Sequence, residues 1–91
     1  MGLHPILVGM TRRLHNWSYR DITTFLKEHG FEYYEPHRGS HGWWAKLKDD
    51  GTPERIVEVN FSKRAYPIQT LKIMIHQSGI NEDEWIKWAN S

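Results

Sequence analysis

The hydrophobic pattern of this chain changes its period at Gly30. Before that glycine, apolar residues recur at helical spacing, and Ser18 followed by Asp21 has the pattern of a capping box at a helix start. After it, aromatic and β-branched residues alternate with polar ones, as in strands. The apolar positions of the helix are Ile22, Phe25 and Leu26. A helix over Tyr19 to His29 that leads directly into strands predicts an α+β domain.

Three segments with strand character follow this helix. They are Phe31 to Glu35, Gly42 to Lys48 and Arg55 to Phe61. The turn residues Asp49 to Pro53 join the last two, and Asp49 and Asp50 are the residue type that supplies turn geometry. Sequential strands with short connections predict a three-stranded antiparallel meander.

The two-residue period of a strand assigns each side chain to one face of the sheet. In the second strand the expected core residues are Trp43, Ala45 and Leu47, and the expected solvent-facing residues are Trp44, Lys46 and Lys48. In the third strand Val57, Val59 and Phe61 share a face, and Ile56, Glu58 and Asn60 lie opposite. One face is therefore expected to be core and the other to be wet.

Two more helices are expected after the sheet. Pro67 begins an apolar stripe that ends near Gly79, and Asn81 with Glu84 forms a capping pair for a short last helix. That helix presents Trp85, Ile86 and Trp88. Residues 18–91 then form a single domain, and residues 1–17, which follow neither period, form an N-terminal extension. Its residues expected to dock on the core are Ile6, Leu7, Val8 and Trp17.

Composition excludes several classes of protein. The 91 residues contain no cysteine, which excludes disulfides, thiolate metal sites and thiol nucleophiles. The longest apolar stretch, Pro5 to Met10, is far shorter than the roughly 20 residues that span a bilayer. Because Arg12 and Arg13 follow that stretch instead of preceding it, the pattern is not that of a secretory signal, and a cytoplasmic location is expected.

The charges are distributed unevenly. Twelve basic and eleven acidic residues give a net charge of only +1, which does not by itself indicate a polyanion partner. Residues 59–81, however, contain three basic residues and no acid. These are Lys63, Arg64 and Lys72. A polyanion such as RNA is expected to meet this segment first, although an ordinary solvated surface would have the same composition.

The segment from Arg38 to Gly42 is the best candidate for chemistry. It connects the first two strands and contains His41, whose side chain has an unperturbed pKa near ~6.5 and suits proton transfer at neutral pH. Gly39 and Gly42 allow close backbone approach to a ligand, and Ser40 offers a hydroxyl. His37 stands four residues before His41, but that spacing crosses a turn and lacks further ligands, so no metal and no cofactor are expected.

Phosphate-binding loops, nucleophile elbows and dinucleotide fingerprints are all absent from the sequence. A nuclease that needs a single base remains compatible with it. Four aromatic residues near the candidate histidine could stack on bases, namely Tyr33, Tyr34, Trp43 and Trp44. Trp44 is the preferred one because it is expected on the wet face. Lys46 and Lys48 on that face would add phosphate contacts.

The order of these pieces resembles the HicA-type mRNA interferase toxins. The resemblance covers Tyr19 to Trp88 and rests on four segments in sequence order, of which Gly39-Ser40-His41 is the most specific. The segments are His29-Gly30-Phe31, Arg38-Gly39-Ser40-His41, Thr70-Leu71-Lys72 with Ile75, and Ser78-Gly79-Ile80.

The resemblance implies a fold like that of a double-stranded-RNA-binding domain and metal-independent cleavage of mRNA, with His41 as general base and a HicB-type antitoxin as partner. Many family members have a Pro-x-His element after the third strand, where this chain has Asn60 to Arg64. Two alternatives therefore stay open: a non-catalytic RNA-binding module of the same fold, and a module that binds only the antitoxin.

Overall fold

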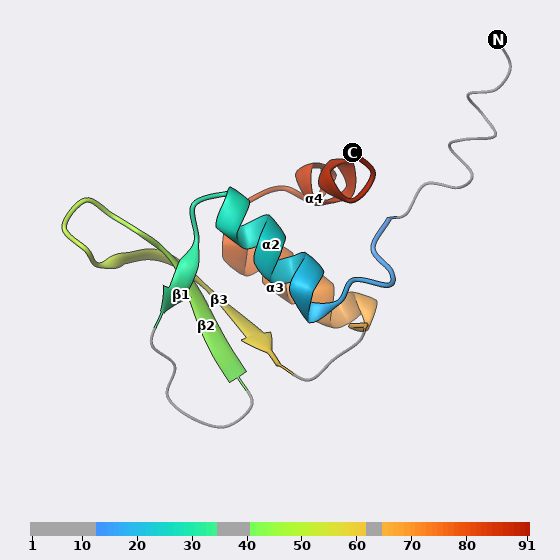
Figure 1. Ribbon diagram of the computed structural model, residues 1–91, viewed down its shortest axis with the longest axis horizontal. Coiled ribbons are helices and arrows are strands. Elements are labelled where there is room, and N and C mark those ends of the chain that lie inside the picture. Colours follow the sequence, from blue (N-terminus) through green and yellow to red (C-terminus); the bar gives the residue numbers. More distant parts are fainter. Residues whose placement is uncertain (1–12, 35–40, 62–64) are drawn as a thin grey trace, which may run out of the picture.

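A computed structural model describes residues 13–34, 41–61 and 65–91 of the protein. In chain order its elements are α2 (Tyr19–Glu28), β1 (Glu32–Tyr34), β2 (His41–Leu47), β3 (Pro53–Asn60), α3 (Ile68–Ser78) and α4 (Glu82–Ala89), as Figure 1 shows. The predicted order of helix, three strands, helix and short helix is confirmed, and with it the α+β class. None of these described helices, with 10, 11 and 8 residues, is long and apolar enough to cross a membrane.

The ends of α2 are set by its own sequence. The Ser18 hydroxyl accepts a hydrogen bond from the Asp21 amide at 3.1 Å, and the Asp21 carboxylate accepts one from the Ser18 amide at 3.0 Å. This confirms the predicted capping box, which satisfies amides that have no partner within the helix. At the other end the chain leaves the helix at His29, and Gly30 follows with φ 91°, a backbone angle that favours glycine.

The three strands form an antiparallel sheet with β2 in the centre. Tyr33 of β1 pairs with Trp44, and Trp44 pairs with Val57 of β3, so these three residues lie on one face. In the turn between β2 and β3, the Asp50 carboxylate accepts hydrogen bonds from the Thr52 hydroxyl at 2.6 Å and the Thr52 amide at 3.0 Å. These bonds lower the pKa of Asp50 below its usual value. The expectation that the turn aspartates serve local geometry is confirmed for Asp50.

The expected faces of β2 are wrong for Trp44 but confirmed for buried Ala45 and for exposed Lys46 and Lys48. Trp44, assigned above to the solvent-facing side, is only 6% exposed and packs in the core with Val57 and Val59. Trp43 and Leu47, expected in the core, are half-buried, whereas Ala45 is fully buried as expected. Alternation showed that the two tryptophans face opposite ways, but both are apolar, and only the pairing with β3 decides which one meets the helices. In β3, by contrast, the expected inward positions of Val57 and Val59 are confirmed.

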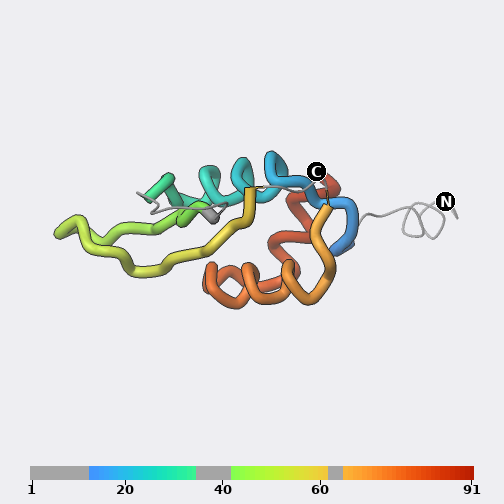
Figure 2. Tube along the Cα trace, turned by 90° about the horizontal axis from the view of Figure 1, so that it is seen from below, coloured from blue at the N-terminus to red at the C-terminus, as the bar shows by residue number. Residues whose placement is uncertain are grey.

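The core lies between the sheet and the two longer helices. In Figure 1 α2 crosses over α3, whereas Figure 2 shows the two helices on opposite sides of the molecule, with the β2–β3 hairpin projecting at the end away from α4. Both helices contribute to one hydrophobic core with the sheet. The residues of α3 in this core are Leu71, Met74 and Ile75. Gln77 of α3 also accepts a hydrogen bond from the backbone amide of Glu58 at 3.0 Å, which satisfies a donor at the edge of β3.

The last helix closes the core together with the segment before α2. Asn81 accepts a hydrogen bond from the Glu84 amide at 3.2 Å, which confirms the predicted cap, and Trp85 is fully buried. Trp17 is also fully buried, with its ring centroid 5.5 Å from those of both Trp85 and Trp88. The expected docking of Trp17 is thus confirmed, whereas Ile6, Leu7 and Val8 lie outside the described residues.

Replacing Trp17 should therefore destabilise the domain far more than replacing a half-buried tryptophan. We expect Trp17→Ala to lower the free energy of unfolding by about 3–5 kcal/mol, as large-to-small changes in cores do. Trp43→Ala, the matched control on the half-buried side of β2, should lose less than half as much, because its ring is already partly in water. Urea titration of both variants measures this, and equal losses would contradict the placement of Trp17 in the core.

Candidate functional site

The candidate histidine begins the central strand. The backbone of His41 is the first residue of β2, and its partner across the sheet is Asn60, the last residue of β3. His41 therefore stands at the end of the sheet opposite the hairpin turn at residues 48–52. Gly39 and Ser40, expected to shape the loop before it, and His37 lie outside the described residues, whereas Gly42 is the second residue of β2.

Gly42 is the meeting point of two aromatic rings. A Cβ atom added at this glycine would lie 3.0 Å from Cζ of Phe61 and 3.2 Å from Cε1 of Tyr33. Contacts that short are not tolerated without movement of the rings, so the missing side chain is what lets the two rings approach. The sequence suggested that Gly42 leaves room for a ligand, whereas in the structure this room is filled by Tyr33 and Phe61.

Two further aromatic residues support these rings, and we call Tyr19, Tyr33, Trp44 and Phe61 the aromatic cluster. The ring centroids of Tyr33 and Trp44 are 5.4 Å apart in a T-shaped arrangement, and those of Tyr19 and Phe61 are 5.5 Å apart. Trp44 is buried, but 47% of Tyr33 and 38% of Phe61 remain exposed. The cluster therefore has a buried base and two rings that reach solvent.

The polar groups of the cluster are partly shielded from water. Burial raises the pKa of the Tyr19 hydroxyl, and the neighbouring Trp44 indole N–H partly offsets that rise. The two groups do not meet with the geometry of a full hydrogen bond, since the Trp44 indole nitrogen is buried without a partner among the described residues. Tyr19 consequently stays neutral throughout the physiological pH range.

Positive charge lies beside the cluster. The Lys27 ammonium nitrogen is 5.6 Å from the centroid of the Trp44 ring, a cation–π distance. Lys46 stands two residues after Trp44 on the same face of β2, and its stem passes Gly30, with Cε 3.6 Å from the position of an added Cβ. Both lysines are exposed, as is Lys48 just after β2. Lys46, one of the residues expected to contact phosphate, therefore lies near the aromatic cluster.

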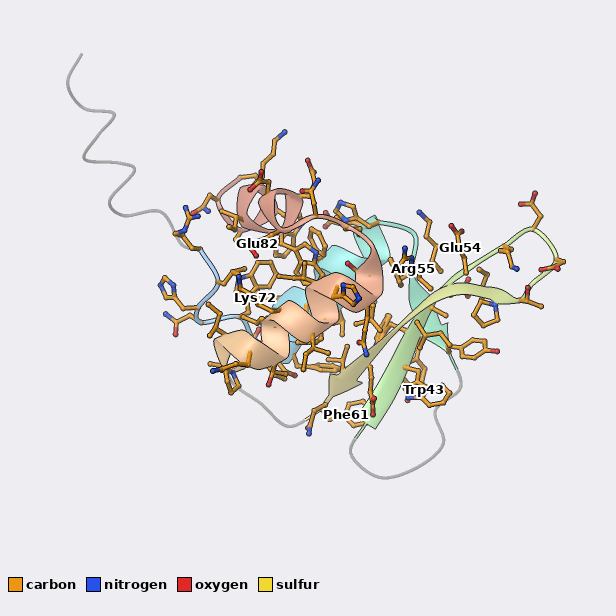
Figure 3. All side chains as sticks on the ribbon, turned by 180° about the vertical axis from the view of Figure 1, so that it is seen from behind. Trp43, Glu54, Arg55, Phe61, Lys72 and Glu82 are labelled. Atoms are coloured by element: carbon orange, nitrogen blue, oxygen red, sulfur yellow. The ribbon has the colours of Figure 1, made fainter. Side chains whose placement is uncertain are left out.

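The structure does not bring Lys72 to this place. Its ammonium nitrogen lies 3.2 Å from a carboxylate oxygen of Glu82, and this ion pair links α3 to the start of α4. Figure 3 shows Lys72 and Glu82 side by side, away from Phe61 and Trp43 at the end of the sheet. Lys63 and Arg64, the other members of the basic segment, lie outside the described residues.

Phe61 and Lys27 are the candidate site residues that the sequence analysis missed, whereas Tyr33 was one of four aromatic residues considered for stacking but was not the preferred one. A signal for Phe61 was present, because it was expected on the face of Val57 and Val59, and a glycine in a central strand leaves space for large neighbours. What was lacking was the register that places Tyr33 and Phe61 on either side of Gly42. Among the residues whose positions are described, no three histidine, aspartate or glutamate side chains form a group that could hold a metal ion.

The outcome of comparison with known proteins is negative. No protein-family model matches the chain, and no curated protein shows significant similarity to it in sequence. The candidate site therefore stands on the residues and geometry given above.

Proposed function

We propose that this protein is a HicA-type toxin: a metal-independent endoribonuclease that cleaves mRNA with His41 as general base, built on a fold like that of a double-stranded-RNA-binding domain. The observation that carries the proposal is the place of Gly39-Ser40-His41 in the chain. This segment follows helix α2, which ends just before Gly30, and the first strand, and it leads into the central strand of a three-stranded sheet with helices before and after it. The spacing of these elements supports the resemblance.

The proposed reaction needs only what an imidazole can supply. Neutral His41 takes the proton from a ribose 2′-hydroxyl or from a water as that oxygen attacks phosphorus, and the P–O bond to the next nucleotide breaks. Cationic side chains would hold the phosphates, and the candidates are Lys46, Lys48, Lys63 and Arg64. A HicB-type antitoxin would cover the same surface. Lys46 and Lys48 are exposed on and just after the strand that His41 begins.

One observation favours a second candidate, a non-catalytic module of the same fold that binds RNA or the antitoxin. The Pro-x-His element of many HicA-type proteins is absent after β3, and the residue paired with His41 is Asn60. A single histidine must then act both as base and, in its protonated form, as acid for the leaving oxygen. The two candidates differ in whether RNA is cut.

Replacement of His41 distinguishes the ribonuclease from the non-catalytic module. We expect His41→Ala to abolish growth arrest and RNA cleavage, because a general base contributes about 10²- to 10⁴-fold to the rate. Thermal unfolding should change little. The matched control is His76→Ala, which removes an exposed histidine from α3 and should leave cleavage intact. Growth arrest that persists in the folded His41→Ala variant would contradict the assignment.

The rate of cleavage in the presence of chelator and at different pH values tests the metal independence and the role of the histidine as base. Cleavage of single-stranded RNA should survive excess EDTA and should rise with pH through the titration of a histidine near pH ~6.5, because only the neutral imidazole accepts a proton. The initial rate is measured from pH 5 to 8 with and without chelator. If EDTA abolishes cleavage and zinc or magnesium restores it, the reaction depends on a bound metal and the metal-independent mechanism is contradicted.

The basic segment after β3 is tested through the dependence of RNA affinity on salt. Each phosphate neutralised on a single strand contributes about 0.7 to the slope of log affinity against log salt, so a Lys63→Ala, Arg64→Ala double variant should flatten it by at most about 1.4. It should also slow association of an acidic antitoxin at low salt. Lys87→Ala on α4 is the control. If neither RNA affinity nor antitoxin association changes in the double variant, Lys63 and Arg64 are ordinary solvated surface.

A further inference from the structure

We propose that Tyr33 and Phe61 form a stacking site for unpaired bases of single-stranded RNA, directly beside the strand end that carries His41. This inference rests on the proposed ribonuclease function, since that function brings an RNA strand to His41. It adds the part of the substrate that is recognised, namely the flat face of a base, and the requirement that the RNA be unpaired there.

The two rings form one surface. They flank Gly42, the residue after His41, and each has an atom within 3.2 Å of the position that a Cβ of Gly42 would occupy. Scattered exposed apolar side chains are normal on a small protein, but these two meet across a glycine that leaves space for both. With 47% of Tyr33 and 38% of Phe61 exposed, both rings offer area to a ligand.

The rings are also held in place before any ligand arrives. Trp44 supports Tyr33 in a T-shaped contact at 5.4 Å, and Tyr19 supports Phe61 at 5.5 Å. Trp44 is itself buried in the core. Side chains that are already ordered lose little conformational entropy on binding, which favours stacking over contacts made by mobile side chains.

The charges beside the rings match an RNA strand. Exposed Lys27 and Lys46 lie next to Trp44 on the face that carries Tyr33. The acid next to Tyr33, Glu32, points to the opposite face of the sheet by strand alternation. Aromatic rings with cations at their side are the combination with which proteins bind single-stranded nucleic acids, the rings stacking on bases and the cations contacting phosphates. In a duplex the base faces are stacked on one another and could not reach Tyr33 or Phe61.

The test measures binding of a 12-residue oligoadenylate to the full-length chain carrying His41→Ala, which prevents cleavage. Tyr33→Ala and Phe61→Ala should each weaken binding by about 5- to 150-fold, the range that corresponds to loss of one stacked base. Tyr33→Phe keeps the ring and should bind like the parent. Tyr34→Ala is the matched control, because Tyr34 is the next residue of β1 and faces the other side. If Tyr33→Ala fails to fold, Tyr33→Leu removes the ring while preserving apolar packing.

Two further measurements identify stacking as the cause. The slope of affinity against salt should stay constant in the ring variants and become flatter in Lys27→Ala, because only the lysine neutralises a phosphate. An abasic oligomer of equal length and charge should bind the parent and Tyr33→Ala with equal affinity. A duplex should also bind both proteins with equal affinity.

The outcomes separate this inference from the proposed function. If the wild-type chain cleaves RNA while the folded ring variants bind oligoadenylate as tightly as the parent, the stacking site is refuted and the ribonuclease stands. If the ring variants lose binding but the wild-type chain cleaves no RNA, the stacking site stands and the ribonuclease is refuted. A ring dependence that is equally strong for the abasic oligomer would also overturn base stacking.

Discussion

The pairing of Trp44 with Val57 determines how the rest of the molecule is arranged. It fixes which face of the central strand meets α2 and α3, and a shift of one residue would place Trp43 there instead. The observed register puts Trp44, Val57 and Val59 together in the core that the sheet shares with the helices. It also places Tyr33, Gly42 and Phe61 on the same side as Trp44, so that core packing and the exposed aromatic surface derive from one alignment.

The elements of the fold could be predicted from the sequence because each has a local signal. The capping box at Ser18 and Asp21, the cap at Asn81 and the end of α3 near Gly79 depend on a few neighbouring residues and were recognised without any tertiary information. The faces of β2 were not predictable in the same way. Trp43 and Trp44 are chemically identical, and which of them is buried depends on partners in β3, thirteen and more residues away.

The candidate site likewise has one part that could be predicted from local sequence and one part that depends on tertiary structure. His41 was identified from residue type and its place between strands, and its backbone does lie at the start of β2. The aromatic pair beside it depends on three strands at once, since Tyr33 lies in β1, Gly42 in β2 and Phe61 directly after β3. The sequence suggested that Gly42 leaves space for a ligand, but in the fold the rings of Tyr33 and Phe61 occupy that space.

The contact between the two ends of the described chain has a consequence for synthesis of the protein. Trp17 is covered by Trp85 and Trp88, and the indole N–H of Trp88 donates a hydrogen bond to Glu28 of α2 across sixty positions of sequence. A nascent chain that has emerged from the ribosome only as far as α3 still exposes Trp17 and Phe25 to water. The core cannot close until α4 has emerged as well, so a chain released only as far as α3 stays incompletely folded, with these aromatic side chains open to non-native contacts.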